Sequence, residues 1–295
     1  MAWRSDIQES SAARFAQEDP DSGPVIRSYG MSFVNNIISA ALEQMPDVAW
    51  DNHAGPGAPP NFTYAVFQED RANRRPGDIV VLGVLSSAIP AMAALSNRTF
   101  SFEQPAPFTY PVYWPSDTGL RRVEPLVNSA EAQRALSGTP AARAWADQLA
   151  TEDAFYSPVT FGATRLDVSP FARLVRRSLA RRHVTRTSAD ILTSNDYPYA
   201  EILRRMIVDF AQTARADGQI PLVLLIQSRD SADVDVAGLV RPVLEREGVA
   251  YLATVDHFDP KDPSGFVSDG HYTPEVDALF GAAFRALLPP GFSQR

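Results

Sequence analysis

A serine, a histidine and an aspartate of this chain are placed where they could carry out nucleophilic catalysis. Ser32 lies in "VIRSYGMSFVNNIISAALEQM", where a short β-branched run gives way to a segment of helical apolar period. His271 follows Asp269 by two residues in "SDGHYTP", so a carboxylate is close enough to orient the imidazole. An imidazole held in this way turns a serine hydroxyl into a nucleophile. The alternative is that Ser32 only caps its helix, since serine is a preferred N-cap residue.

The other three histidines have different surroundings. His53 lies in the glycine loop "HAGPGAPPN", His183 in a run of arginines, and His257 next to an aspartate. A single histidine is more often structural than catalytic, and the combination of serine, histidine and aspartate is a more specific signal than any one of them. The chain has no cysteine, which excludes a thiolate nucleophile, a disulfide framework and a cysteine-ligated metal.

Alternating strands and helices are predicted around these residues. The runs "DIVVLGVL" and "IPLVLLIQS" are unbroken apolar segments, as in strands buried on both faces of a parallel sheet. Apolar residues at helical spacing predict helices between the strands. We expect strands at 25–28, 48–50, 78–85, 220–228 and 249–255, and helices at 32–45, 62–74, 199–216, 236–247 and 273–287. This order predicts an α/β fold, a three-layer α/β/α arrangement around a doubly wound parallel sheet.

The chain is expected to form one main domain with an insertion. Residues 1–24 are a polar N-terminal arm, and 25–295 are a single domain whose insertion covers about 97–190. The insertion begins with "FSFEQPAPFTYPVYWPSD", which is too apolar for a disordered linker. Its aromatic residues form either the insertion's own core or a platform for sugar rings or acyl chains. They are Phe100, Phe102, Phe108, Tyr110, Tyr113 and Trp114.

Charge and composition exclude several classes of protein. The formal net charge is -8 and the isoelectric point is about 5.1, so the chain as a whole is a poor candidate for binding nucleic acid or an anionic membrane. The basic run from Arg173 to Arg186 is either the solvated side of a helix or a phosphate-binding face. No apolar run reaches the roughly 18 residues of a membrane-spanning helix.

The cellular compartment and the oligomeric state stay open at this point. Residues 1–24 lack an apolar signal core, so the chain as given has no export signal. A chain trimmed of its leader would have the same sequence.

Four segments resemble the conserved blocks of the SGNH/GDSL hydrolases. "SYGMSF" looks like the first block, Gly-Asp-Ser, and "AGPGAPP" looks like the glycine block. "DIVVLG" looks like the strand that leads into the Gly-x-Asn-Asp block. "SDGHYTPEVDALFGAAF" looks like the last block, in which Asp and His precede a proline and the terminal helix. The resemblance covers about residues 25–288 and is weak between 97 and 190.

The resemblance implies a flavodoxin-like three-layer fold and a serine esterase that works through an acyl-enzyme without a cofactor or a metal. It implies that Ser32 is the nucleophile, His271 the general base and Asp269 the residue that orients the base. The backbone N–H groups of Ser32 and Gly55 would hold the oxyanion. The substrate would be a carboxylic ester, such as an acyl or acetyl ester of a small molecule, a glycan or a lipid.

Two positions depart from the family pattern. Met31 stands where the first block has its aspartate. After "VVLG", Ser86 and Ser87 stand near the place of the asparagine that donates a side-chain hydrogen bond to the oxyanion. We expect one of these two serines to replace that donor, or both to begin the next helix. The alternatives to hydrolysis are O-acyl transfer to a glycan, and a catalytically weak protein that binds a glycan or a lipid.

Overall fold

The computed structural model describes residues 3–19, 23–101, 108–161, 168–229 and 234–292. The chain divides into two compact units. The sheet unit consists of Ile7–Ile89 and Leu203–Arg295, and the insertion unit consists of Met1–Asp6 and Pro90–Ile202.

The sheet unit contains a five-stranded parallel sheet with the order β2-β1-β3-β6-β7. The strands are β1 (Ile26–Tyr29), β2 (Trp50–Asn52), β3 (Ile79–Leu85), β6 (Ile220–Ile226) and β7 (Ala250–Ala253). This order is that of flavodoxin-like folds, and it confirms the predicted doubly wound parallel sheet. The chain order reverses between β1 and β3, and ligands of such sheets bind beyond the carboxyl ends of the strands at that point.

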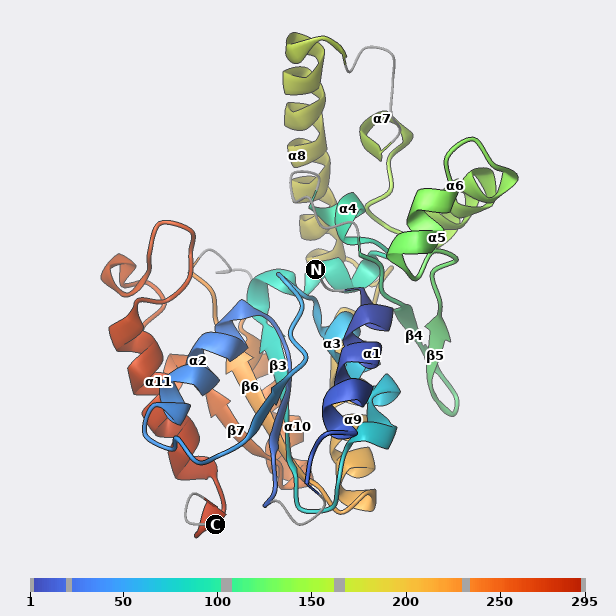
Figure 1. The fold of residues 1–295 in the computed structure, drawn as a ribbon. Helices are drawn as coiled ribbons and strands as arrows, with labels where there is room; N and C mark the ends of the chain where they lie inside the picture. The colour runs from blue at the N-terminus through green and yellow to red at the C-terminus, as the bar shows by residue number, and fades with distance from the viewer. Residues whose placement is uncertain (1–2, 20–22, 102–107, 162–167, 230–233, 293–295) are drawn as a thin grey trace. The chain divides into compact units, whose positions relative to one another are not determined.

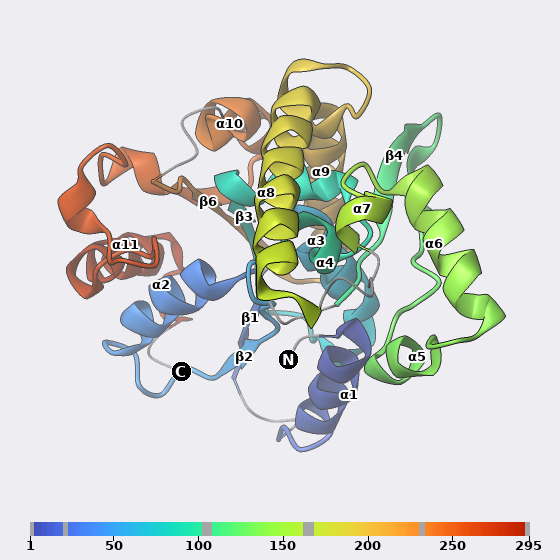
Figure 2. The same cartoon turned by 90° about the horizontal axis from the view of Figure 1, so that it is seen from above.

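Helices cover both faces of this sheet (Figures 1 and 2). On one face α2 (Ser32–Leu42) lies against α11 (Pro274–Leu287). On the other face lie α3 (Pro60–Glu69), α9 (Tyr199–Ala216) and α10 (Val236–Glu247). All seven residues of β3 are buried, as its unbroken apolar run predicts.

Two glycines let α2 approach the sheet closely. A Cβ atom on Gly83 of β3 would lie 2.2 Å from Cγ2 of Val34, and one on Gly30 would lie 2.5 Å from the same atom. Real Cβ atoms do not come this close to a neighbour, so the isopropyl group of Val34 occupies space that only glycine leaves free. The first turn of α2 is therefore held directly over the ends of β1 and β3.

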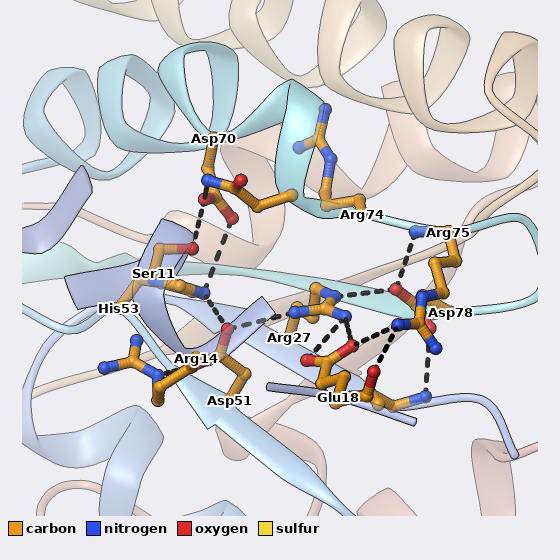
Figure 3. Close-up of polar contacts among 12 residues, drawn as sticks. Ser11, Arg14, Glu18, Arg27, Asp51, His53, Asp70, Arg74, Arg75 and Asp78 are labelled. Atoms are coloured by element: carbon orange, nitrogen blue, oxygen red, sulfur yellow. Dashed lines mark hydrogen bonds and ion pairs between the residues drawn. The ribbon is translucent and has the colours of Figure 1, made fainter. Parts of the chain in front are cut away.

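A buried ionic cluster lies at the β1–β2 side of the sheet (Figure 3). The guanidinium of Arg27 is fully buried and forms ion pairs with Glu18, Asp51 and Asp78 at 2.6 to 3.0 Å. Burial acts to lower the pKa of Arg27, and the hydrogen bonds and charges of Glu18 and Asp78 outweigh this and raise it. We call these four residues the Arg27 cluster.

The cluster and its neighbours also fix the N-terminal helix α1 (Arg4–Phe15). Arg14 binds Asp51, and the Ser11 hydroxyl donates to Asp70. Residues 1–24, expected as a polar arm, therefore include a helix whose sheet-unit part is joined to the sheet by polar contacts (Figure 3).

The insertion unit combines a β-hairpin with several helices. They are η3 (Pro90–Ala93), α4 (Asn97–Phe100), β4 (Val112–Ser116), β5 (Gly119–Val123), α5 (Ala130–Ala135), α6 (Pro140–Glu152), α7 (Pro158–Phe161) and α8 (Pro170–Thr193). Phe108, Tyr110 and Tyr113 are buried, as expected of a core, whereas Trp114 is half-buried. Phe102 lies outside the described residues.

The basic run from Arg173 to Arg186 lies on α8. Among the described residues, no helix combines the length and the apolar character needed to cross a lipid bilayer.

Candidate active site

Ser32 is the first residue of α2 and is not its cap. The N-cap position belongs to Met31, which is extended (φ -137°) and makes no side-chain capping bond. The Oγ atom of Ser32 lies 2.6 Å from Nε2 of His271. The serine at the end of β1 therefore presents its hydroxyl to an imidazole that is 239 residues away in the sequence.

His271 and Asp269 occupy a tight turn before α11. The Asp269 carboxylate lies 3.0 Å from Nδ1 of His271 and accepts a hydrogen bond from the His271 backbone N–H at 3.1 Å. Gly270 between them has φ +88°, a backbone conformation that glycine adopts without strain. An antiparallel bridge between Phe266 and Tyr272 closes the turn. A single carboxylate oxygen thus fixes both the backbone and the ring of His271.

Aromatic contacts hold the imidazole in place. The ring of Phe33, the residue after Ser32, stacks on the His271 ring with centroids 4.6 Å apart and planes 25° apart. The Tyr272 ring meets Phe33 edge to face, and its hydroxyl donates to the carbonyl of Gln227 just beyond β6. The turn that carries His271 is therefore anchored to the carboxyl end of the sheet.

Two carboxylates act on His271 from different environments. Asp269 is 68% exposed, and the N–H and ring of His271 lower the pKa of its carboxyl. Asp277 on α11 is buried, and burial raises its pKa to about 6, against the opposing effects of the Asn36 side chain and the His271 charge. One Asp277 carboxylate oxygen has no hydrogen-bond partner in the described part of the chain.

Sequence reasoning missed Asp277. The signal for it was present, because it is an acid on the apolar face of its helix, where Val276, Phe280 and Phe284 are also buried.

The two backbone N–H groups that were expected to hold an oxyanion differ from each other. The N–H of Ser32 has no partner among the described residues and lies at the N-terminus of α2, where the helix dipole favours negative charge. The N–H of Gly55, in contrast, donates to the carbonyl of Gly30 at 3.0 Å. This bond ties the glycine loop to the end of β1, so the expected role of Gly55 as a free oxyanion donor is not met.

The two serines after β3 have separate settings. Ser86 is fully buried; its Oγ accepts the backbone N–H of Ser228 at 2.9 Å and lies 3.3 Å from the Ser228 hydroxyl. It joins the ends of β3 and β6, so of the two candidate serines Ser86 has a structural role. Ser87 is exposed in the short 3-10 turn η2 (Ser86–Ala88).

In the described part of the chain, the remaining histidines have no hydrogen bond with Ser32. His53 is buried, stacks on Tyr29 with centroids 4.9 Å apart, and has Nε2 3.0 Å from Asp51. His183 in the insertion unit contacts the carbonyl of Phe155 at 3.1 Å. His257 is exposed after β7.

The site therefore consists of a hydroxyl that contacts an imidazole, which in turn contacts a carboxylate, at the carboxyl end of a parallel sheet. The described residues contain no group of three or more histidine, aspartate or glutamate side chains suited to hold a metal ion. No known protein-family model matches this chain, and no curated protein matches its sequence at a significant level.

Proposed function

We propose that the protein is a serine hydrolase that cleaves carboxylic esters through an acyl-enzyme, as its resemblance to the SGNH hydrolases implies. The contact between Ser32 Oγ and His271 Nε2, with Asp269 on the other ring nitrogen, carries the proposal. Hydroxyl, imidazole and carboxylate in hydrogen-bond reach are the parts of a triad, which is identified by geometry and not by position in the sequence.

In the first half of the reaction His271 acts as base and then as acid. With its Nδ1 proton shared with Asp269, the ring accepts the Ser32 proton at Nε2 while Oγ attacks the ester carbonyl carbon. The carbonyl oxygen becomes an oxyanion, which the N–H of Ser32 stabilises at the start of α2. The His271 proton then goes to the leaving alkoxide, and the alcohol departs.

In the second half, water replaces the alcohol. His271 takes one proton from water while the water oxygen bonds to the acyl carbon. The bond between the acyl carbon and Ser32 Oγ then breaks, the proton returns from His271 to Oγ, and the carboxylic acid is released. A sugar hydroxyl in place of water would give acyl transfer by the same steps.

A fluorophosphonate probe tests the nucleophile directly. We expect the wild type to be labelled and to hydrolyse a short-chain aryl ester, and Ser32→Ala to lose both. Ser39→Ala is the matched control, since Ser39 is exposed on the same helix and should leave labelling and turnover unchanged. If Ser32→Ala keeps the label, or more than a tenth of the turnover, Ser32 is not the nucleophile.

The base is tested in the same assay. His271→Ala should be nearly as damaging as Ser32→Ala, because nucleophile and base act as one unit and their losses do not add. Addition of an acceptor glycan distinguishes hydrolysis from transfer: an acylated glycan in place of free acid would show a transferase. Tight binding of a glycan or lipid without labelling would show a binding protein.

A further inference from the structure

The insertion unit contains a cavity of about 460 Å³ that the proposed ester chemistry does not use. It lies between the end of α6, the last turns of α8 and the segment that follows α8. A volume of this size suits a small molecule, because ligand pockets commonly range from roughly 300 to 1,000 Å³.

The lining of the cavity is acidic. Four carboxylates line it and no lysine, arginine or histidine does; they are Glu152, Asp153, Asp190 and Asp196. Within the described part of the chain, Glu152, Asp190 and Asp196 have no side-chain hydrogen bond or ion pair. Three uncompensated negative charges around one cavity attract a cation and repel an anion.

Asp153 differs from the other three carboxylates. It is buried and accepts hydrogen bonds from the N–H groups of Leu95 and Phe155 and from the Thr99 hydroxyl. Its role is to hold the local backbone, so the ligand-facing charge comes from the other three.

Aromatic rings form the second part of the lining. Trp114, Tyr156 and Tyr197 border the cavity, and Trp114 meets Tyr197 edge to face with centroids 5.2 Å apart. An aromatic face attracts an ammonium group.

We propose that this cavity binds a small organic cation, with its ammonium group among Glu152, Asp190 and Asp196 and its body against Trp114. An amino sugar or an amino alcohol has this chemistry, and a neutral sugar lacks its charge.

Isothermal titration of the full chain tests the proposal with three probes: glucosamine, choline and glucose. Glucosamine and glucose have the same ring and differ in the ammonium group. We expect saturable binding of glucosamine and choline that weakens as salt is added, and binding of glucose that is at least tenfold weaker.

Charge-neutralising variants identify the site. The double variant Glu152→Gln/Asp196→Asn should weaken glucosamine at least tenfold, and Trp114→Phe should weaken it several-fold. Glu131→Gln is the control, since Glu131 is an exposed acid on α5 of the same unit and outside the cavity lining.

Three outcomes would overturn the proposal. The first is that neither cation binds saturably at about 10 mM, a level that corresponds to less than roughly 3 kcal/mol of binding free energy. The second is that glucose and glucosamine bind equally well. The third is that the double variant binds glucosamine with unchanged affinity. The double variant changes side chains that are half-buried or exposed, so its folding can be verified by its unfolding temperature.

Discussion

Replacement of Gly83 by alanine should displace the serine from its histidine. The new Cβ would lie 2.2 Å from Cγ2 of Val34, whereas ordinary contacts begin at 3.4 Å, so the two groups must separate by about 1.2 Å to reach an ordinary contact. Val34 lies two residues after Ser32 on the first turn of α2. The His271 turn is held separately by Tyr272 at the end of β6.

The size of the effect follows from these distances. A displacement of 1.2 Å directly away from the ring would lengthen the 2.6 Å contact between Ser32 Oγ and His271 Nε2 to about 3.8 Å, beyond hydrogen-bond reach. A misplacement of about 1 Å can lower turnover about 100-fold. Overpacking should also cost about 1–3 kcal/mol of unfolding free energy.

A second substitution provides the sharp test. Val34→Ala removes the atom at 2.2 Å, and the next neighbours of the new Cβ, at 3.4 and 3.6 Å, are ordinary contacts. Gly83→Ala/Val34→Ala should therefore recover turnover and stability relative to Gly83→Ala alone. The matched control is Gly30→Ala, whose Cβ would still lie 2.8 Å from the Val34 Cβ, so Val34→Ala should not rescue it.

The measurements are turnover of an aryl ester and the unfolding temperature of each single and double variant. A coupling energy of about 0.5–3 kcal/mol between positions 83 and 34 is the expected range for contacting residues. The reasoning is refuted if Gly83→Ala keeps full turnover and stability, or if Val34→Ala rescues Gly30→Ala as well as Gly83→Ala. The stability result does not depend on the proposed activity.

Four further outcomes concern polar side chains, of which Asp277, Arg27 and Ser86 are buried and Ser87 is exposed. Folding raises the pKa of Asp277 from 3.8 to about 6, so its protonated form stabilises the fold at low pH, and this contribution is lost as pH rises through about 6. In urea unfolding, Asp277→Asn should therefore have a free energy of unfolding up to about 2–3 kcal/mol above that of the wild type at pH 8. At pH 4 the two proteins should differ little. Arg27→Leu leaves the buried carboxylate of Asp78 without an ion pair among the described residues and should cost about 3–5 kcal/mol in the same assay, and an unchanged midpoint would contradict the Arg27 cluster. Ser86→Ala should lower the unfolding temperature because it removes the Oγ that accepts the Ser228 N–H, at a cost of about 1–3 kcal/mol. Ser87→Ala should lower turnover at unchanged stability if its hydroxyl meets the oxyanion, and turnover equal to wild type removes Ser87 from the site.

The sheet was predictable because local pattern and burial agree there. The predicted helices 199–216 and 236–247 match α9 and α10 at both ends, since apolar periodicity and a following glycine mark them. The helix predicted at 62–74 begins earlier, at Pro60, and ends at Glu69. Proline fits the first turn of a helix, so the prolines that looked like loop residues begin this one.

Long-range polar contacts were beyond sequence reasoning. Nothing near α1 in the sequence shows that Ser11 bonds Asp70 or that Arg14 meets Asp51, because these partners are 59 and 37 residues away. Arg27 within a strand resembles a solvent-facing residue until its three carboxylate partners are placed around it.

The part of the candidate site that depends on the type and order of its side chains was predictable. Ser32, Asp269 and His271 were found from the order of their segments, and the structure brings them within hydrogen-bond reach. The Gly55 amide and the Ser86 hydroxyl were assigned by position alone, and position does not show which acceptor or donor a group has already found. The N–H of Gly55 already donates to the carbonyl of Gly30.

The turn that joins Asp269 to His271 has a consequence for how such a site is gained or lost. Asp269 and His271 are two residues apart, and one Asp269 oxygen holds both the backbone and the ring of His271, so they form one local unit between Phe266 and Tyr272. A deletion of one residue in this turn is expected to displace both side chains together and to spare the sheet, because neither residue belongs to a strand or a helix. In evolutionary terms, a lineage could gain or lose the proposed activity through one short loop, while Ser32 stayed in place at the start of its helix.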